Sequence, residues 1–177
     1  VLMSAISGLD TALWDIKGRW LGQPVHALLG GPVRDRVRSY CWIPGDRPGD
    51  LIGGAEALIA AGYDACKFNV CGEMLALDTY AKADEVIRRL FELRAAVGAR
   101  LDLALDFHGR VHLPVARVLL RELEPIRPLF VEDAVAAGAV EEAEGLSRLT
   151  STPLCFGERM HSRAEFKRLF ERRIAQV

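Results

Sequence analysis

From residue 37 onwards, segments with the pattern of a β-strand alternate strictly with segments with the pattern of an α-helix. Short apolar runs bounded by turn residues predict strands at 37–43, 63–70, 101–107, 129–135 and 153–158. Apolar residues recurring every three or four positions predict helices at 48–62, 74–98, 113–125, 140–150 and 162–173. A strand–helix–strand order needs a crossover connection, which joins parallel strands, so a parallel sheet is expected.

Two architectures combine parallel strands with crossover helices: the open doubly wound sheet and the closed (β/α)8 barrel. The sequence contains no G-x-G-x-x-G after its first predicted strand and no G-x-x-x-x-G-K-[ST] anywhere. The nucleotide-binding forms of the open sheet therefore lose their main signature. Residues 174–177 have the pattern of a sixth strand. Before the alternation, residues 7–22 have an amphipathic helix pattern that starts with a capping box formed by Ser7 and Asp10.

Three acids occupy equivalent places on three successive predicted strands. Asp106 ends the third strand, Glu132 lies near the end of the fourth and Glu158 ends the fifth, at regular intervals of 26 residues (106, 132, 158). In a barrel these strand ends share one rim, where catalytic groups gather. Carboxylates that converge there repel one another unless protonation or a cation relieves the repulsion, and oxygen ligands suit Mg²⁺ or Mn²⁺. The spacing predicts a metal site, with helix caps or surface ion pairs as the alternative.

Two further pairs of polar residues lie at predicted strand ends. Lys67 and Asn69 are two positions apart on the second strand and therefore share a face, which can look into the rim beside the acids. The alternative for Lys67 is a surface lysine of which only the aliphatic stem is buried. Asp106 and His108 are also two positions apart, and strand geometry predicts that they share a face as well.

Composition and charge exclude several classes of protein. The 177 residues contain 23 Lys and Arg against 24 Asp and Glu, so the basic excess typical of nucleic-acid partners is missing. No apolar run approaches the ~20 residues that span a bilayer, and no signal-peptide pattern opens the chain. We expect a cytoplasmic protein without nucleic-acid or membrane partners. The cysteines, none of which forms a C-x-x-C pair, are expected to be structural thiols.

Five segments carry a family resemblance: AISGLDTALWDIKGRWLGQPVHALLGG, VRSYCW, LDFHGRV, RELEPIRPLFVED and GERMHSRAEFKRL. Together they resemble the mandelate racemase branch of the enolase superfamily, and within it most closely the D-galactonate dehydratase group of acid-sugar dehydratases. The resemblance implies an α/β fold, a partial (β/α)8 TIM-like barrel of about five to six βα units. It divides the chain into a helical connection from a capping domain (1–35) and the barrel segment (36–177).

The same resemblance implies chemistry and roles. Family members dehydrate a sugar acid, here with D-galactonate as first candidate, to a 2-keto-3-deoxy acid through a metal-stabilised enediolate. The metal is Mg²⁺, or Mn²⁺, and its ligands match Asp106, Glu132 and Glu158. His108, beside the first ligand, is expected to protonate the departing hydroxyl, with a structural imidazole as the alternative. Arg159 either reaches the substrate or braces the rim.

Two departures from the family pattern bear on these roles. Racemases and lactonizing enzymes usually carry Lys-x-Lys on the second strand, where this chain has Lys67-Phe68-Asn69. A second lysine that could act as base is therefore missing, which counts against racemase chemistry and suits a dehydratase that binds its substrate through Lys67 and Asn69. On the fourth strand Glu-Glu-Pro is replaced by Glu132-Asp133-Ala134, and Asp133 is expected to point to the face opposite Glu132.

Both ends of the sequence are expected to be incomplete. In the family the general base is a histidine on the seventh strand, held by an aspartate on the sixth, and Val177 comes before either. A full-length form is expected to be a homo-oligomer. The competing hypotheses are a truncated homologue without catalysis and a racemase or cycloisomerase of the same superfamily.

Overall fold

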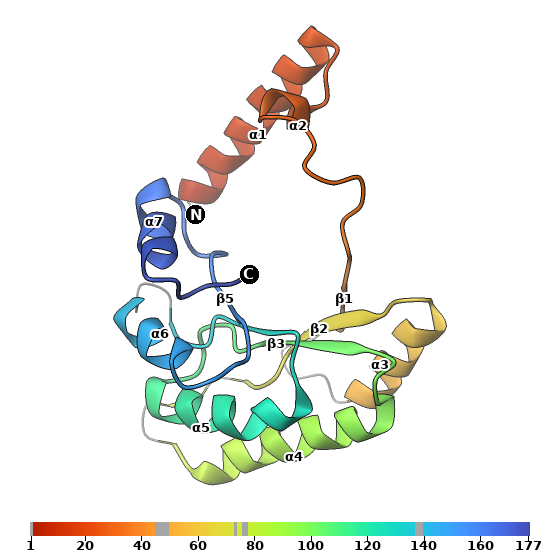
Figure 1. The fold of residues 1–177 in the computed structure, drawn as a ribbon, viewed down its shortest axis with the longest axis vertical. Helices are drawn as coiled ribbons and strands as arrows, with labels where there is room; N and C mark the ends of the chain where they lie inside the picture. Colours follow the sequence, from red (N-terminus) through yellow and green to blue (C-terminus); the bar gives the residue numbers. More distant parts are fainter. Residues whose placement is uncertain (1, 45–49, 73, 76–77, 137–139) are drawn as a thin grey trace. The chain divides into compact units, whose positions relative to one another are not determined.

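The structure is a computed structural model that describes residues 2–44, 50–72, 74–75, 78–136 and 140–177. Its internal contacts divide the chain into two units, one up to Arg38 and one from Ser39 onwards (Figure 1). The start of the predicted helix at 48–62, and part of the one at 74–98, lie outside the described residues.

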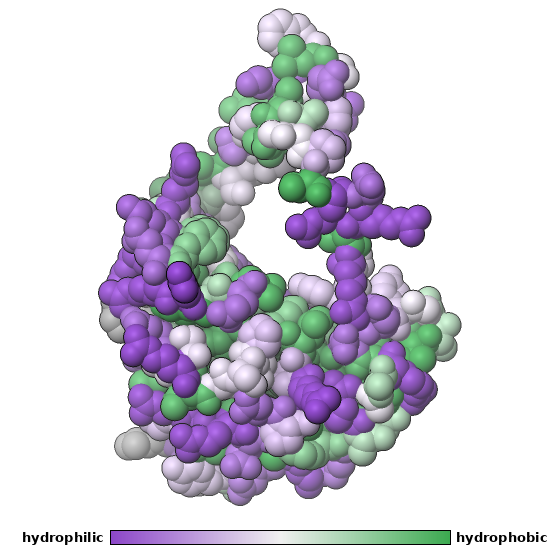
Figure 2. Space-filling view, in the orientation of Figure 1, coloured by the Kyte–Doolittle hydropathy of each residue, from purple (hydrophilic) through white to green (hydrophobic). Residues whose placement is uncertain are grey.

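The first unit consists of α1 (Leu2–Leu21) and α2 (Val25–Leu28). Because α1 begins at Leu2, the predicted capping box is wrong: Ser7 lies inside the helix, where its carbonyl accepts a hydrogen bond from Thr11 Oγ1 at 2.8 Å. Gly18 allows a close approach, since a Cβ there would lie 2.8 Å from the Gln23 carbonyl oxygen. Hydrophobic side chains are visible on the surface of this unit (Figure 2), and Trp20 is 84% exposed.

The second unit contains one five-stranded parallel sheet, with the strands in chain order. The strands are β1 (Cys41–Trp42), β2 (Ala65–Asn69), β3 (Asp102–Asp106), β4 (Phe130–Glu132) and β5 (Leu154–Cys155). A doubly wound sheet reverses its strand order at a switch point, whereas a (β/α)8 barrel adds each strand beside the one before. The strand order β1-β2-β3-β4-β5 has no such reversal and therefore indicates the barrel topology.

Helices connect the strands and cover one face of the sheet. They are α3 (Leu51–Ala60), α4 (Tyr80–Val97), α5 (Leu113–Leu123), the 3₁₀ turn η1 (Glu124–Ile126), α6 (Val140–Ser147) and α7 (Arg163–Glu171). Neighbours along the chain pack on each other, α3 on α4, α4 on α5 and α5 on α6, as in the outer ring of a barrel (Figure 1). Within the described parts, none of the helices is long and apolar enough to cross a membrane.

The two faces of the sheet carry different side chains. On the helix side, Cys66, Phe68, Leu103, Leu105 and Leu154 are fully buried and belong to the hydrophobic core. The opposite face carries the polar groups, because the register pairs Asn69 with Asp106, Asp106 with Glu132, and Glu132 with Cys155. Paired residues of parallel strands share a face, so the topology itself gathers these polar side chains.

The helix ends follow the caps that the sequence offers. Asp50 Oδ1 accepts the Gly53 amide at 2.7 Å at the start of α3. At the start of α7, Ser162 and Glu165 form the predicted capping box, which is confirmed. Such caps satisfy backbone amides that have no partner within the helix.

The edge strands are shorter than predicted. The strand expected at 37–43 covers only Cys41–Trp42, and the one expected at 153–158 covers only Leu154–Cys155. The predicted sixth strand is not assigned as one, yet Gln176 N donates to Leu154 O at 3.0 Å, so the segment does lie along β5. Glu158 therefore belongs to the loop after β5 and does not end the strand.

Candidate functional site

The predicted site residues gather at the carboxyl ends of the parallel strands. Asn69, Asp106 and Glu132 are the last residues of β2, β3 and β4 and lie in one row across the sheet. All three are buried. The row lies at the edge of the sheet where barrel enzymes hold their catalytic groups.

Lys67 joins two of the predicted metal ligands. Its Nζ lies 2.5 Å from Glu132 Oε2 and 3.5 Å from Asp106 Oδ2. The three side chains are 13%, 10% and 3% exposed in the order Lys67, Glu132, Asp106, so the ion cluster is largely shielded from water. The surface-lysine alternative is therefore wrong, and Lys67 lies beside the acids.

Two aromatic rings of the β1 region complete the surroundings of the ammonium. Lys67 Nζ lies 5.3 Å from the centroid of Trp42 and 5.8 Å from that of Tyr40, distances typical of cation–π contacts. Burial by itself lowers the pKa of Lys67, but the hydrogen bond and charge of Glu132 and the charge of Asp106 outweigh it, so the pKa is raised. Lys67 is accordingly a stable cation between two carboxylates.

His108 lies just beyond β3 in a left-handed turn. Its φ is 54°, and its backbone N–H donates to Asp106 Oδ1 at 2.7 Å. The turn brings His108 Nδ1 to 3.8 Å from Asp106 Oδ2 and 3.9 Å from Glu158 Oε1. Nδ1 is buried and has no hydrogen-bond partner among the described residues. The predicted proximity of Asp106 and His108 is therefore present, but a turn and not strand alternation produces it.

Arg159 links the loops that follow three strands. Its Nη2 donates to the His108 carbonyl at 2.9 Å, and its Nε lies 3.4 Å from Asp133 Oδ2 and 3.3 Å from Glu158 Oε1. Asp133 was expected on the opposite face, and this is wrong: its φ of 43° ends the strand alternation, so the carboxylate turns toward Arg159. Burial, followed by the negative charge of Glu158, raises the pKa of Asp133 to about 6.

Asp133 is the site residue that strand periodicity missed. A short polar residue directly after a buried strand was the available signal, because Asn and Asp enter the left-handed region more readily than most residues.

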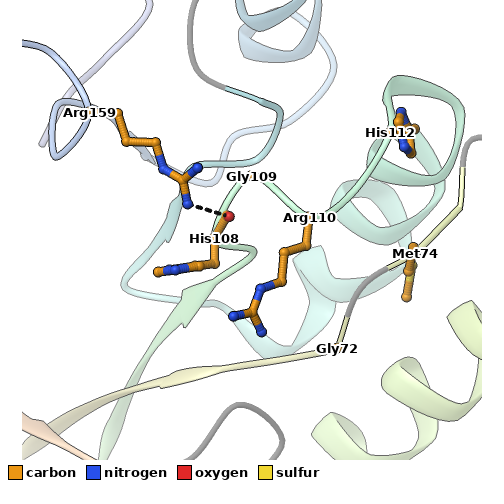
Figure 3. A pocket seen from close by; sticks show the side chains of 7 residues that line it. All are labelled: Gly72, Met74, His108, Gly109, Arg110, His112 and Arg159. Carbon is orange, nitrogen blue, oxygen red and sulfur yellow. Dashed lines mark hydrogen bonds between the residues drawn. The ribbon is translucent and has the colours of Figure 1, made fainter. Parts of the chain in front are cut away.

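A pocket of about 580 Å³ lies over the loops that follow β2, β3 and β5. Figure 3 shows His108, Gly109, Arg110 and His112 along one loop, with the guanidinium of Arg159 reaching across to the His108 carbonyl. Gly72 and Met74 line it from the segment after β2. The described lining contains two arginines and two histidines and no acid, so it suits an anionic or polyhydroxylated ligand.

The predicted ligands fit a hard cation by their chemistry. Carboxylate oxygens are the donors that Mg²⁺ and Mn²⁺ prefer, and a positive group already lies between Asp106 and Glu132. Glu158 Oε1 lies 3.9 Å from His108 Nδ1, the same atom that lies 3.8 Å from Asp106 Oδ2. Among the described residues, no three His, Cys, Asp or Glu side chains converge closely enough to hold a metal ion. A site shared by all three acids stays a prediction.

Burial makes two cysteines of the sheet, Cys66 on β2 and Cys155 on β5, poor nucleophiles. It raises the pKa of the Cys66 and Cys155 thiols to about 12, and for Cys155 the charge of Glu132 adds to the effect. At pH 8 very little thiolate is present, so we expect iodoacetamide to label both at least ~100-fold more slowly than in the unfolded chain. Mass spectrometry of labelling time courses with and without denaturant measures this. Equal rates in the two conditions would contradict the burial of these strands.

Both units match known protein families. Residues 50–177 match the family described as enolase C-terminal domain-like. Residues 1–30 match the N-terminal domain family of mandelate racemase and muconate lactonizing enzyme. The first match covers well over half of the chain.

Individual relatives agree with this. A D-galactonate dehydratase of Ralstonia nicotianae is 53% identical over 171 residues, 97% of this chain and 45% of that protein, so the chain spans about half the length of such curated relatives. A mandelate racemase/muconate lactonizing enzyme-like protein of Rubrobacter xylanophilus superposes with a TM-score of 0.86 at 28% identity, covering 99% of this chain and 51% of that one. An enolase of Pantoea ananatis with bound D-gluconate and Mg, 26% identical, gives a TM-score of 0.78 and covers 94% and 48%.

Proposed function

The chain belongs to the enolase superfamily, and from this premise we propose that its full-length form dehydrates a sugar acid, with D-galactonate as the first candidate, to a 2-keto-3-deoxy acid. The observation that carries the proposal is the position of His108, whose Nδ1 faces Asp106 and Glu158 at the wall of a pocket without acidic lining among the described residues. The D-galactonate dehydratases to which the chain is similar support the choice of substrate.

In the proposed reaction His108 is the general acid. The α-proton of the substrate leaves to a general base, and the electron pair of that C–H bond is delocalised into the substrate carboxylate as an enediolate. His108 then gives its proton to the hydroxyl on the neighbouring carbon, so the C–O bond breaks, the electron pair forms a double bond to that carbon and water leaves. The remaining enol converts to the 2-keto group. The left-handed turn supports this role because it places His108 in the lining of the pocket.

Asp106, Glu132 and Glu158 are the proposed ligands of a divalent cation, Mg²⁺ or Mn²⁺. When bound, this ion supplies charge stabilisation for the substrate carboxylate as the α-proton leaves. The enolase of Pantoea ananatis with bound D-gluconate and Mg supports the pairing of a sugar acid with this ion.

Lys67 and Asn69 are proposed to bind the substrate from β2. They share the polar face of the sheet with Asp106 and Glu132, and the ammonium of Lys67 is a suitable partner for a carboxylate. The absence of a second lysine at position 69 supports dehydration over racemisation, because no lysine base is available there.

The test is an assay of the purified full-length protein with a panel of aldonic acids. We expect D-galactonate to be converted to a product with a 2-keto-3-deoxy group. Activity should vanish in EDTA and return with Mg²⁺ or Mn²⁺. Inversion of the α-carbon without loss of water would overturn the proposal in favour of a racemase. A folded protein that neither binds a divalent cation nor turns over any member would overturn it in favour of an inactive homologue.

A further inference from the structure

The backbone of His108 is held by side chains on both sides. Its N–H donates to Asp106 Oδ1 at 2.7 Å, and its carbonyl accepts from Arg159 Nη2 at 2.9 Å. A residue with a Cβ pays about 1–2 kcal/mol for the left-handed conformation, and such conformations persist where the surroundings impose them. These two hydrogen bonds act together with the turn bond from Arg110 N to Phe107 O, at 3.0 Å, to keep His108 at φ 54°.

Arg159 is itself fixed by the loops after β4 and β5. Its Nε faces two carboxylates, Asp133 Oδ2 at 3.4 Å and Glu158 Oε1 at 3.3 Å. Nε and Nη2 lie in one rigid guanidinium plane, so the anchoring of one fixes the direction of the other. A lysine carries a single flexible ammonium and cannot serve the carboxylates and the His108 carbonyl in this way.

The backbone of Gly109, the next residue, lies close to the guanidinium. Gly109 has φ 62°, and a Cβ there would lie 3.7 Å from Arg159 Cζ and 3.5 Å from Ala136 Cα. The Gly109 amide also donates to Asp133 O at 3.0 Å. The turn, the end of β4 and Arg159 therefore form one packed unit around the backbone of His108.

We infer that Arg159 is a positioning residue for His108: it sets the place of the proposed general acid through the backbone and does not itself bind the substrate. This rests on the proposed function. If the inference holds, loss of Arg159 slows the protonation step much more than it weakens substrate binding. The inference also gives Asp133 a role, as the buried carboxylate that anchors Arg159 from β4.

The test compares Arg159→Met and Arg159→Lys with the wild type in the full-length protein, with Arg163→Met, an exposed arginine at the start of α7, as the matched control. For Arg159→Met we expect the kcat of D-galactonate dehydration to fall ~10–100-fold, because small displacements of a catalytic group have effects of this size. KM should stay within about threefold, and α-proton exchange with solvent should survive. The kcat of Arg159→Lys should fall nearly as far as that of Arg159→Met, and the control should have the kcat and KM of the wild type.

A second readout does not depend on activity. Hydrogen–deuterium exchange of the peptide covering 106–110 should become faster in Arg159→Met and stay unchanged in the control. A rise in KM that accounts for the whole loss of kcat/KM would overturn the inference, because Arg159 would then bind the substrate directly. Equal loss of dehydration and α-proton exchange, or unchanged deuterium uptake at 106–110, would also overturn it. If the wild type catalyses neither reaction, the proposed function fails, while deuterium uptake still decides on positioning.

Discussion

Replacing His108 with asparagine in the full-length protein should lower the rate of sugar-acid dehydration by about 10²–10⁴-fold, the usual contribution of a general acid. Exchange of the substrate α-proton with solvent should continue, because removal of that proton comes before the protonation of the hydroxyl. Asparagine is the informative substitution because it tolerates the left-handed backbone that His108 adopts at φ 54°. The turn should therefore persist without a group that can donate the proton.

Two measurements are needed: formation of the 2-keto-3-deoxy product, and loss of the α-proton signal by NMR in D₂O. His26→Asn, in the exposed part of α2, is the matched control and should leave both rates unchanged. If His108→Asn abolishes exchange together with dehydration, His108 serves binding or folding and the assignment of the general acid is wrong.

The order of strands and helices could be predicted from the sequence, since their strict alternation allows few topologies. Sequential parallel strands and the barrel family are confirmed. The lengths of β1 and β5 could not be predicted as well. Each pairs with a single neighbour within the sheet, so its ladder depends on fewer hydrogen bonds than the pattern of apolar residues suggests.

The site was predictable where strand geometry controls it. The interval of 26 residues placed Asp106 and Glu132 in one row, which the register confirms. Strand alternation no longer holds one or two residues beyond the strands. His108 and Asp133 have positive φ values, so the alternation that predicted their directions no longer applied. The contact between Lys67 and Glu132 also lay beyond prediction, because it spans from β2 to β4 and depends on the register of β3 between them.

Replacing Lys67 with methionine should have the second large effect, a loss of stability of the metal-free protein. The ammonium of Lys67 is the positive charge between the carboxylates of Asp106 and Glu132, in a cluster largely shielded from water. Removing one partner of a buried ion pair costs about 3–5 kcal/mol, since the remaining charges stay uncompensated. In EDTA, Lys67→Met should therefore unfold at a clearly lower temperature than the wild type.

The same substitution should make stability depend on divalent cations. Without the ammonium, a cation that binds Asp106 and Glu132 no longer competes with a positive charge and relieves their repulsion. A ligand that binds only the folded state raises its stability in proportion to the logarithm of its concentration over Kd. Millimolar Mg²⁺ should therefore restore much of the loss in Lys67→Met and stabilise the wild type less. Thermal unfolding with and without Mg²⁺, together with calorimetric titration of Mn²⁺, measures both effects.

Lys167→Met separates this effect from a general loss of charge. Lys167 pairs with Glu171 on the surface of α7 at 3.5 Å, with side chains 71% and 63% exposed, and exposed pairs contribute about 0–1 kcal/mol. Its loss should change neither the unfolding temperature much nor the response to Mg²⁺. If Lys67→Met is as stable as the wild type in EDTA, the ion cluster does not hold the strand ends together. If the affinity of Lys67→Met for Mn²⁺ falls instead of rising, Lys67 supports the bound cation. The proposed competition between its ammonium and the cation for Asp106 and Glu132 is then wrong.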